Sequence, residues 1–208
     1  MDLLAELTQS AGIALTPLQR DRFASYSQLL KDWQPKVNLV ASVAEEDLVH
    51  RHFFDCIMAQ SLVTINGPLL DLGSGAGFPG VVFQIMKPDL PVCLAEPRKK
   101  RVAFLEAVVK ELGLTNTQVY PKKIVPGILP MPVESVVTRA VESIEATLKR
   151  AAEFLPPGGS AYFMKGPKVD EELAALSLEP LGFVQNDDLA YALPAINRSR
   201  RLLVFQKE

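Results

Sequence analysis

Three alternating glycines behind a short apolar segment are well suited to bring the backbone close to a ligand. Gly73, Gly75 and Gly77 follow residues 69–72, which are three leucines and Asp71. Because glycine has no Cβ, a loop of this kind can turn sharply between a strand and a helix and approach a bound molecule closely. Tight turns also use glycine without a ligand, but three alternating glycines after a first parallel strand favour ligand binding.

Two carboxylates indicate which ligand the loop binds. The spacing Gly75-x-Gly77-x-x-Gly80 satisfies the dinucleotide fingerprint, and Glu96 lies 19 residues after Gly77, where a ribose-binding carboxylate is found. Such a carboxylate serves NAD and S-adenosylmethionine equally. Asp71, however, would attract the cationic amino-acid end of S-adenosylmethionine and repel a pyrophosphate. S-adenosylmethionine is therefore the favoured cofactor, and a nicotinamide-dependent oxidoreductase is the alternative.

The elements that must position this loop alternate as in a parallel α/β sheet. Helices are expected at residues 98–112 and 143–155. The expected strands are residues 69–72, 91–96, 117–120, 133–138, 160–165, 183–189 and 202–205. The order predicts the class I S-adenosylmethionine-dependent methyltransferase fold, which is Rossmann-like with a mostly parallel seven-stranded sheet and an antiparallel last strand. The turn at residues 155–159, Leu-Pro-Pro-Gly-Gly, is typical of the same fold.

Helices are expected before the sheet. Thr16 and Gln19 form a capping box at the start of the first long helix, and Ser42 and Glu45 form another for a helix that runs to about residue 62. We therefore expect these N-terminal helices beside the sheet rather than as a separate unit.

Length and composition bound the organisation of the chain. With 208 residues, 48% of them hydrophobic, it suits a helical cap at 1–66 and a methyltransferase domain at 67–208 in a single compact unit. The cysteines and histidines form no ligand-like cluster, so no metal site is expected. Without a membrane span or a signal peptide, we expect a cytoplasmic protein, and a monomer.

Positive charge is clustered although the net charge is −2. The clusters are residues 98–101, the pair Lys122 and Lys123, and the arginines of residues 198–201. A run of like charges is usually a solvated surface, but three clusters allow one basic face on an acidic protein. Contact with RNA phosphates is then about as plausible as simple solvation.

From about Trp33 to Phe205, the chain resembles the bacterial 16S ribosomal RNA guanine-N7 methyltransferases, also called glucose-inhibited division protein B. The resemblance is carried by segments in a fixed order: residues 38–43, 51–55, 71–80, 100–105, 138–140, 165–166 and 200–202. It implies transfer of a methyl group from S-adenosylmethionine to N7 of one guanine in 16S rRNA. The implied partner is the free rRNA, the small ribosomal subunit or its assembly intermediate.

The resemblance also implies roles for individual residues. The expected cofactor-binding residues are Asp71, Gly73, Ser74, Gly75, Gly77, Phe78, Glu96, Lys123, Ile124 and Arg139. The expected RNA-binding residues are Arg51, His52, Arg98, Lys99, Lys100, Arg101, Lys165, Arg198, Arg200 and Arg201. Arg139 and Lys165 would position the reactants. Structural interpretations compete with some of these roles, because Arg139 could simply pair with a carboxylate and His52 shares a helical face with core residues.

The chain departs from the family at residues 122–124, where no acidic side chain is available to hold the adenine. The chemistry is nevertheless consistent, since N7 of guanine carries a free lone pair and its methylation needs positioning rather than a general base. Exocyclic-amine methylation would need an Asn/Asp-Pro-Pro motif near Arg139, and cytosine methylation a cysteine there. A methyltransferase for another acceptor and a non-catalytic ribosome-assembly factor that binds RNA are further alternatives.

Overall fold

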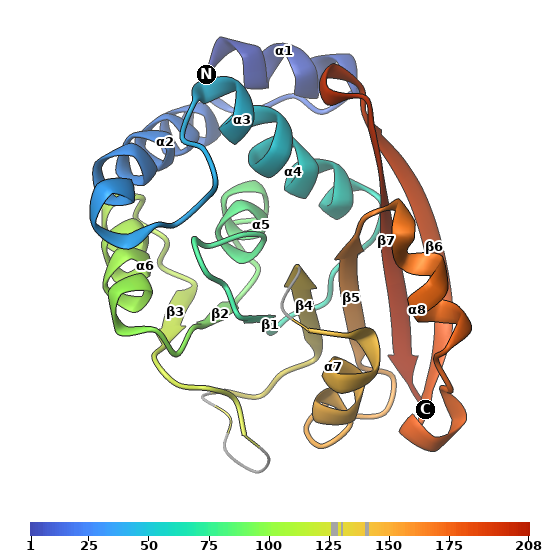
Figure 1. Cartoon of the computed structure of the whole chain (residues 1–208). Helices are drawn as coiled ribbons and strands as arrows, with labels where there is room; N and C mark the ends of the chain where they lie inside the picture. Colours follow the sequence, from blue (N-terminus) through green and yellow to red (C-terminus); the bar gives the residue numbers. More distant parts are fainter. Residues whose placement is uncertain (126–128, 130, 140–141) are drawn as a thin grey trace.

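A seven-stranded sheet forms the centre of the molecule (Figure 1). The computed structural model describes residues 1–125, 129, 131–139 and 142–208, so Ala140 of the resemblance lies outside the described residues. The strands are β1 (Leu69–Leu72), β2 (Val92–Ala95), β3 (Thr117–Tyr120), β4 (Ser135–Arg139), β5 (Ser160–Lys165), β6 (Phe183–Leu193) and β7 (Arg198–Lys207). Their order is β3-β2-β1-β4-β5-β7-β6, and β7 alone runs antiparallel to the other six strands, which confirms the predicted class I fold.

The last two strands extend beyond their expected bounds. A single 3-10 turn at Pro194–Ile196 and the left-handed residue Asn197 connect them, so β6 runs to Leu193 and β7 begins at Arg198. Side chains at the start of β7 are exposed and polar, and therefore leave no apolar alternation to detect in the sequence. Backbone pairing with β6 holds the start of β7, and Tyr191 and Leu193 of β6, which lie opposite it, are buried.

The helices flank the sheet and include a long N-terminal set. They are α1 (Asp2–Ser10), α2 (Pro17–Val37), α3 (Glu45–Leu48), α4 (Phe54–Ser61), α5 (Gly80–Met86), α6 (Lys99–Glu111), α7 (Ile144–Ala151) and α8 (Asp170–Ala174). A π-helical turn at Val49–Phe53 joins α3 to α4, and short 3-10 turns lie at Pro167–Val169 and Glu179–Leu181. Among the described residues, no helix has both the length and the apolarity to cross a bilayer.

One of the two expected capping boxes is present. The Thr16 side chain accepts from the backbone N–H of Gln19, whose own side chain accepts from the Thr16 N–H, so α2 begins as predicted. The box at Ser42 and Glu45 was a wrong prediction, because Ala44 is the N-cap of α3 and no side chain caps it. The Ser42 hydroxyl instead accepts from the Ala44 N–H, a local turn that competes with capping.

Two hydrophobic cores lie on opposite faces of the sheet, because successive strand residues point to opposite sides. Leu70 and Cys93 belong to the core beneath α7, whereas Leu69 and Leu94 belong to the larger core beneath the N-terminal helices, α5 and α6. The N-terminal helices therefore bury their apolar faces on the sheet itself. We propose that the helical cap at residues 1–66 and the methyltransferase domain at residues 67–208 form a single compact unit, since this core contains residues of both.

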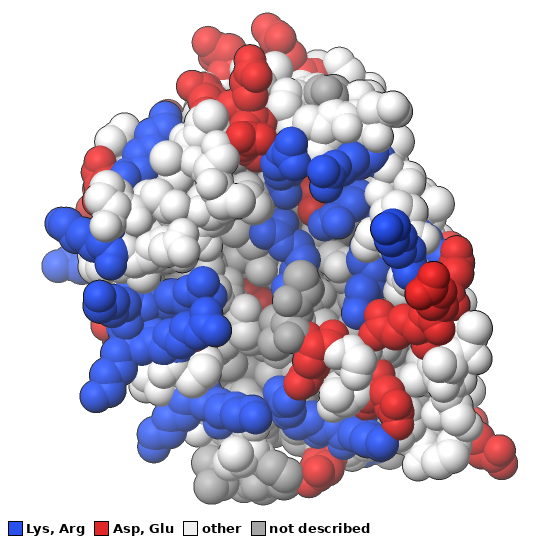
Figure 2. Space-filling model, viewed as in Figure 1, with Lys and Arg blue, Asp and Glu red and all other residues white. Residues whose placement is uncertain are grey.

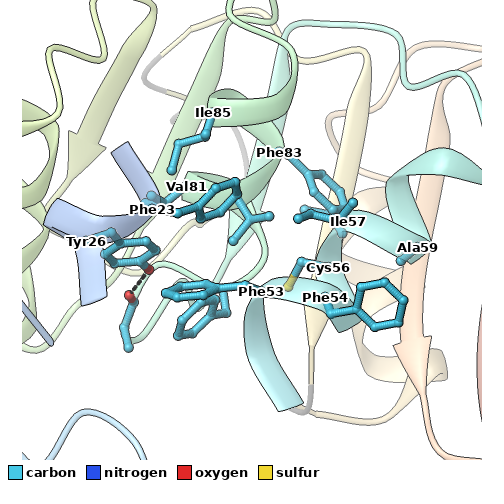
Figure 3. Packing of buried hydrophobic residues seen from close by; sticks show 14 of the residues in the cluster. Phe23, Tyr26, Phe53, Phe54, Cys56, Ile57, Ala59, Val81, Phe83 and Ile85 are labelled. Atoms are coloured by element: carbon cyan, nitrogen blue, oxygen red, sulfur yellow. Dashed lines mark hydrogen bonds between the residues drawn. The ribbon is translucent and has the colours of Figure 1, made fainter. Parts of the chain in front are cut away.

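Aromatic side chains of the N-terminal helices reach the glycine loop (Figure 3). Tyr26 and Phe53 are fully buried, and their rings lie 5.4 and 5.9 Å from the ring of Phe78. The Tyr26 hydroxyl donates to the backbone carbonyl of Ala76 at 2.5 Å. α2 and the π-helical turn thus support the loop from behind and fix its position over the sheet.

Candidate active site

A cavity of about 390 Å³ opens where β1, β2 and β4 end. It is lined by Leu39, Val40, His52, Gly73, Ser74, Gly75, Ala76, Phe78, Glu96, Pro97, Arg98, Arg101 and Arg139. The strand order reverses at β1, which has β2 on one side and β4 on the other. Open α/β sheets bind ligands outside the carboxyl ends of their strands at such a reversal. The cavity is therefore the candidate active site.

The glycines of the loop divide into two that line the cavity and one that packs behind it. Gly73 and Gly75 have φ values of 71° and 61°, a left-handed conformation that side chains disfavour, and both border the cavity. At Gly77 a Cβ would lie 2.6 Å from the Tyr26 hydroxyl oxygen. Gly77 is therefore required for packing against α2, and it does not line the cavity.

Asp71 lies beneath the loop rather than in the cavity. Its side chain is fully buried, and Oδ2 accepts from the backbone N–H of Gly80 at 3.0 Å. Oδ1 has no partner among the described residues. Burial raises the pKa of this carboxyl to about 7, against the lowering effect of the Gly80 N–H. The structure thus gives Asp71 a role in holding the loop, where the sequence suggested contact with the cofactor.

Glu96 fastens the loop after β1 to the loop after β2. Its side chain is only 3% exposed, yet it borders the cavity. Oε2 accepts from the backbone N–H of Gly75 at 3.1 Å, and Oε1 accepts from the N–H of Arg98 at 2.8 Å. Each carboxylate oxygen has a further lone pair, so the same group can accept from hydroxyls in the cavity.

Arg139 and His52 form a wall of the cavity over Phe78. The guanidinium carbon of Arg139 lies 5.1 Å from the centre of the Phe78 ring, and the His52 ring stacks on Phe78 at 4.7 Å and 18°. Arg139 Nη2 donates to His52 Nδ1 at 2.9 Å. Because arginine only donates, this contact requires an unprotonated Nδ1 and leaves the proton of a neutral ring on Nε2. Burial, and then the charge of Arg139, lower the pKa of His52 to about 3, so the ring stays neutral.

The buried carboxylate of Asp55 stands behind this wall and was given no role from the sequence. It accepts from the Tyr191 hydroxyl at 2.7 Å and from Arg200 Nη2 at 2.6 Å. Arg139 Nη1 lies 3.5 Å from Oδ2. The strand-end arginine therefore does pair with a carboxylate, and it also lines the cavity.

Several residues expected at the cofactor or the RNA lie elsewhere. Lys123 and Ile124 do not line the cavity, and Ile124 is buried in the core beneath α7. Lys165 pairs with Glu172 at 2.9 Å and borders a different hollow, so it does not meet Arg139 across the cavity. Its partner Glu172 also accepts from the first N–H of α7, at Ile144.

Other arginines of the expected RNA-binding set are held by acidic partners. Arg51 pairs with Asp47 one helical turn away at 2.6 Å. Arg200 is paired with Asp55, and Arg201 bonds both Asp188 and Asp170. Arg198, at the start of β7, is exposed. The partners of Arg200 and Arg201 could not be read from the sequence, because they lie far along the chain, whereas Asp47 lies at the i,i+4 spacing from Arg51.

A basic hollow adjoins the cavity. It has a volume of about 560 Å³, lies between the end of α2 and the start of α6, and shares Arg98 and Arg101 with the cavity. Its basic residues are Lys36, Arg98, Lys99, Lys100 and Arg101. Figure 2 shows Lys and Arg side chains gathered over the α6 region, whereas acidic side chains gather at the upper edge. Lys36 was not predicted as a functional residue, because it stands alone in the sequence rather than in a basic cluster. Leu39 and Val40, which were given no role beyond the segment 38–43 of the resemblance, line the cavity.

Known proteins with similar sequences are named as ribosomal RNA methyltransferases. A relative from Bdellovibrio bacteriovorus named ribosomal RNA small subunit methyltransferase G 2 is 37% identical over 99% of this chain and 81% of its own length. A relative of the same name from Syntrophobacter fumaroxidans is 38% identical over 99% of this chain, which spans 41% of that protein. A ribosomal RNA small subunit methyltransferase G from Clostridium botulinum is 32% identical over 99% of this chain and 90% of its own length.

Solved structures show the same fold at low sequence identity. A Burkholderia thailandensis 1,6-didemethyltoxoflavin-N1-methyltransferase is 13% identical, with a TM-score of 0.59 over 88% of this chain and 89% of its own. The glycopeptide N-methyltransferase MtfA is 12% identical, with a TM-score of 0.59 over 76% of this chain and 87% of its own. Both are class I methyltransferases in fold, and the likeness concerns the fold alone.

The sequence itself matches a family model. The model is described as rRNA small subunit methyltransferase G, and it matches residues 19–186. A methyltransferase family leaves the oxidoreductase alternative without support. From this match and from relatives of 37 and 32% identity, of whose length this chain covers 81 and 90%, the chain belongs to the rRNA small subunit methyltransferase G family of S-adenosylmethionine-dependent enzymes.

Proposed function

We propose that this enzyme transfers the methyl group of S-adenosylmethionine to N7 of a guanine in 16S rRNA. The observation that carries the proposal is the cavity itself, which joins the glycine loop and the Glu96 carboxylate to a wall without a general base. Family membership supports rRNA as the methyl acceptor. We further propose that the enzyme acts as a monomer in the cytoplasm, on the small subunit or on an assembly intermediate.

The residues at the cavity suit the cofactor. A volume of about 390 Å³ is in the range of small-molecule sites. The Glu96 oxygens can accept from the two ribose hydroxyls while they still hold Gly75 and Arg98, and charge-assisted bonds of this kind are strong. Gly73 and Gly75 let the backbone approach the methionine portion closely. When bound, the cofactor would supply a methyl group on a sulfonium.

The titratable groups of the site suit an acceptor that needs no deprotonation. His52 stays neutral at physiological pH, since its pKa is about 3. The thiols of Cys56 and Cys93 are buried, which raises their pKa values to about 12 and excludes them as nucleophiles. N7 of guanine attacks with its own lone pair, so the protein needs only to bring the two reactants into line.

The basic hollow gives the rRNA a place beside the cavity. Lys36, Lys99 and Lys100 are positively charged and border the hollow that adjoins the cofactor cavity through Arg98 and Arg101. Contacts with phosphates of this kind position a nucleic acid without reading its sequence. We assign the phosphodiester backbone near the target guanine to this surface.

The decisive experiment is methyl transfer with labelled S-adenosylmethionine to small subunits from a strain that lacks this gene. We expect label in 7-methylguanosine at a single position of 16S rRNA. Subunits from the parent strain, already methylated, are the control and should accept almost no label. Label in another nucleoside would overturn the N7 assignment, and no label in any RNA would overturn the proposed substrate.

The melting temperature of the protein tests the cofactor separately. NAD should leave the melting temperature unchanged, whereas S-adenosylhomocysteine should raise it.

A further inference from the structure

The carboxylate of Asp55 is shared unequally between two arginines. Arg200 of β7 binds it with two nitrogens, Nη2 to Oδ2 at 2.6 Å and Nε to Oδ1 at 3.1 Å, and the Tyr191 hydroxyl of β6 also donates to Oδ1. Arg139 of β4 reaches Oδ2 only at 3.5 Å. Arg200 therefore occupies the bidentate position, which is the strongest geometry for this pair.

The unequal sharing leaves a positive charge at the cavity. Asp55 is fully buried and carries one negative charge against two guanidiniums. Both oxygens of the Asp55 carboxylate are bonded to Arg200. Arg139 instead lines the cavity beside His52, which is neutral. A positive charge on the wall of a cavity, partly shielded from solvent, attracts an anion there more strongly than it would in bulk water.

We propose that Arg200 and Asp55 are positioning residues for Arg139. By holding Asp55 with two nitrogens, Arg200 keeps the Arg139 guanidinium turned toward the cavity, where it pairs with the carboxylate of the amino-acid end of S-adenosylmethionine. The inference rests on the proposed function, since it takes S-adenosylmethionine as the occupant of the cavity. It replaces the sequence-based expectation that Arg200 contacts RNA, and it links the C-terminal hairpin to cofactor binding.

The test is calorimetric binding of two ligands to the full chain with Arg200→Met. Once Arg200 is gone, Arg139 can move onto Asp55 and turn away from the cavity. We expect the affinity for S-adenosylhomocysteine to fall roughly tenfold or more, the loss typical of one charge-assisted bond. Methylthioadenosine has the adenosine and the sulfur but no carboxylate, so its affinity should not change. Arg200→Lys keeps a cation on Asp55 and should restore part of the lost affinity.

Arg150→Met is the matched control. Arg150 bonds Glu142 with Nη2 at 2.6 Å and is 20% exposed, against 22% for Arg200, but it lies on α7 away from the cavity. This variant should bind both ligands as the wild type does. Equal weakening of both ligands by Arg200→Met would show a merely structural role and overturn the inference. The inference would also be overturned if Arg200→Met bound S-adenosylhomocysteine as the wild type does but bound rRNA more weakly and with less salt dependence. That result would indicate that Arg200 contacts RNA.

These outcomes also separate the inference from the proposed function. A wild-type protein that binds neither ligand would overturn the cofactor cavity and the inference with it. A wild-type protein that binds both ligands and methylates small subunits, while Arg200→Met weakens both ligands equally, would overturn the inference alone. Tyr191→Phe removes one donor from Asp55 but no charge, and we expect a smaller loss in the same direction.

Discussion

At Glu96 a single carboxylate holds the backbone amides of Gly75 and Arg98 and borders the cavity. Glu96→Gln keeps the shape but removes the charge that strengthens bonds to ribose hydroxyls. We expect the affinity for S-adenosylhomocysteine to fall by about 10- to 100-fold, from one or two charge-assisted bonds. Calorimetric titration would measure it, with Glu106→Gln on the exposed side of α6 as the control. Equal affinities for Glu96→Gln and the wild type would contradict the ribose role.

Asp71 makes the stability of the protein depend on pH. Its pKa is about 7 in the folded chain against an ordinary value of 3.8, because burial disfavours the charged form. The folded state therefore keeps the proton that the unfolded chain releases near pH 4, and the stability due to Asp71 falls as pH rises from about 4 to 7. Asp71→Asn does not titrate. Urea unfolding at several pH values in this range would measure the free energy of unfolding of both proteins. As pH rises, the value for the variant should increase relative to that of the wild type by up to about 4 kcal/mol, and a difference that does not change with pH would refute the pKa shift.

Residue roles were predictable where they depend on neighbours in the sequence. Glu96 and Gly75 lie on loops that consecutive strands bring together, so their closeness follows from the βαβ pattern. Asp55 and Arg200 could not be paired in this way, because they lie on a helix and on the last strand, which meet only in the complete fold. The same applies to Lys165 and Glu172, since a salt bridge leaves no periodicity in a sequence.

At the scale of elements, sequence patterns located the strands but not always their ends. β1 occupies the predicted residues because burial on both faces selects apolar side chains, here three leucines around the buried Asp71. β7 starts before its predicted beginning because exposed polar residues can pair through their backbone. The failed capping box at Ser42 shows the same limit, since a hydroxyl close to a helix start can equally serve a turn.

α6 offers a separate test of RNA binding, because positive charges at its start are unfavourable to the helix itself. Lys99 and Lys100 lie in its first turn, where the macrodipole prefers acidic residues. Lys99→Glu with Lys100→Glu should therefore leave the free energy of unfolding unchanged or higher. The same change should weaken rRNA binding and reduce the slope of log K against log salt by roughly one to two, since each phosphate contact contributes about 0.7–0.9.

Filter binding at several salt concentrations would measure that slope. Lys110→Glu, at the opposite end of α6 and away from the basic hollow, is the control and should leave the slope unchanged. An unaltered slope in the Lys99 and Lys100 variant would mean that these side chains are only solvated, which was the competing interpretation of the charge run.

At the scale of the whole molecule, the glycine loop is enclosed by parts of the chain that are far apart in sequence. Tyr26 of α2 contacts the loop on the side away from the cavity. Arg200 of the C-terminal hairpin pairs with Asp55, which in turn lies beside Arg139 at the cavity wall. The N-terminal helices and the sheet share one core. Sequence patterns placed these helices beside the sheet, but they could not show that their aromatic residues pack against the cofactor loop.

A shared core predicts that the N-terminal helices and the sheet unfold together. Trp33, the only tryptophan of the chain, lies on α2 with its ring 5.8 Å from that of Phe104 on α6, so its fluorescence reports on contact between the N-terminal helices and the sheet domain. Circular dichroism reports on all helices and strands. We expect coincident urea midpoints from the two signals, as for a two-state domain, and an equal shift of both with S-adenosylhomocysteine. A fluorescence transition at lower urea would instead make residues 1–66 an independent cap, and a ligand shift confined to circular dichroism would separate that cap from the cofactor site.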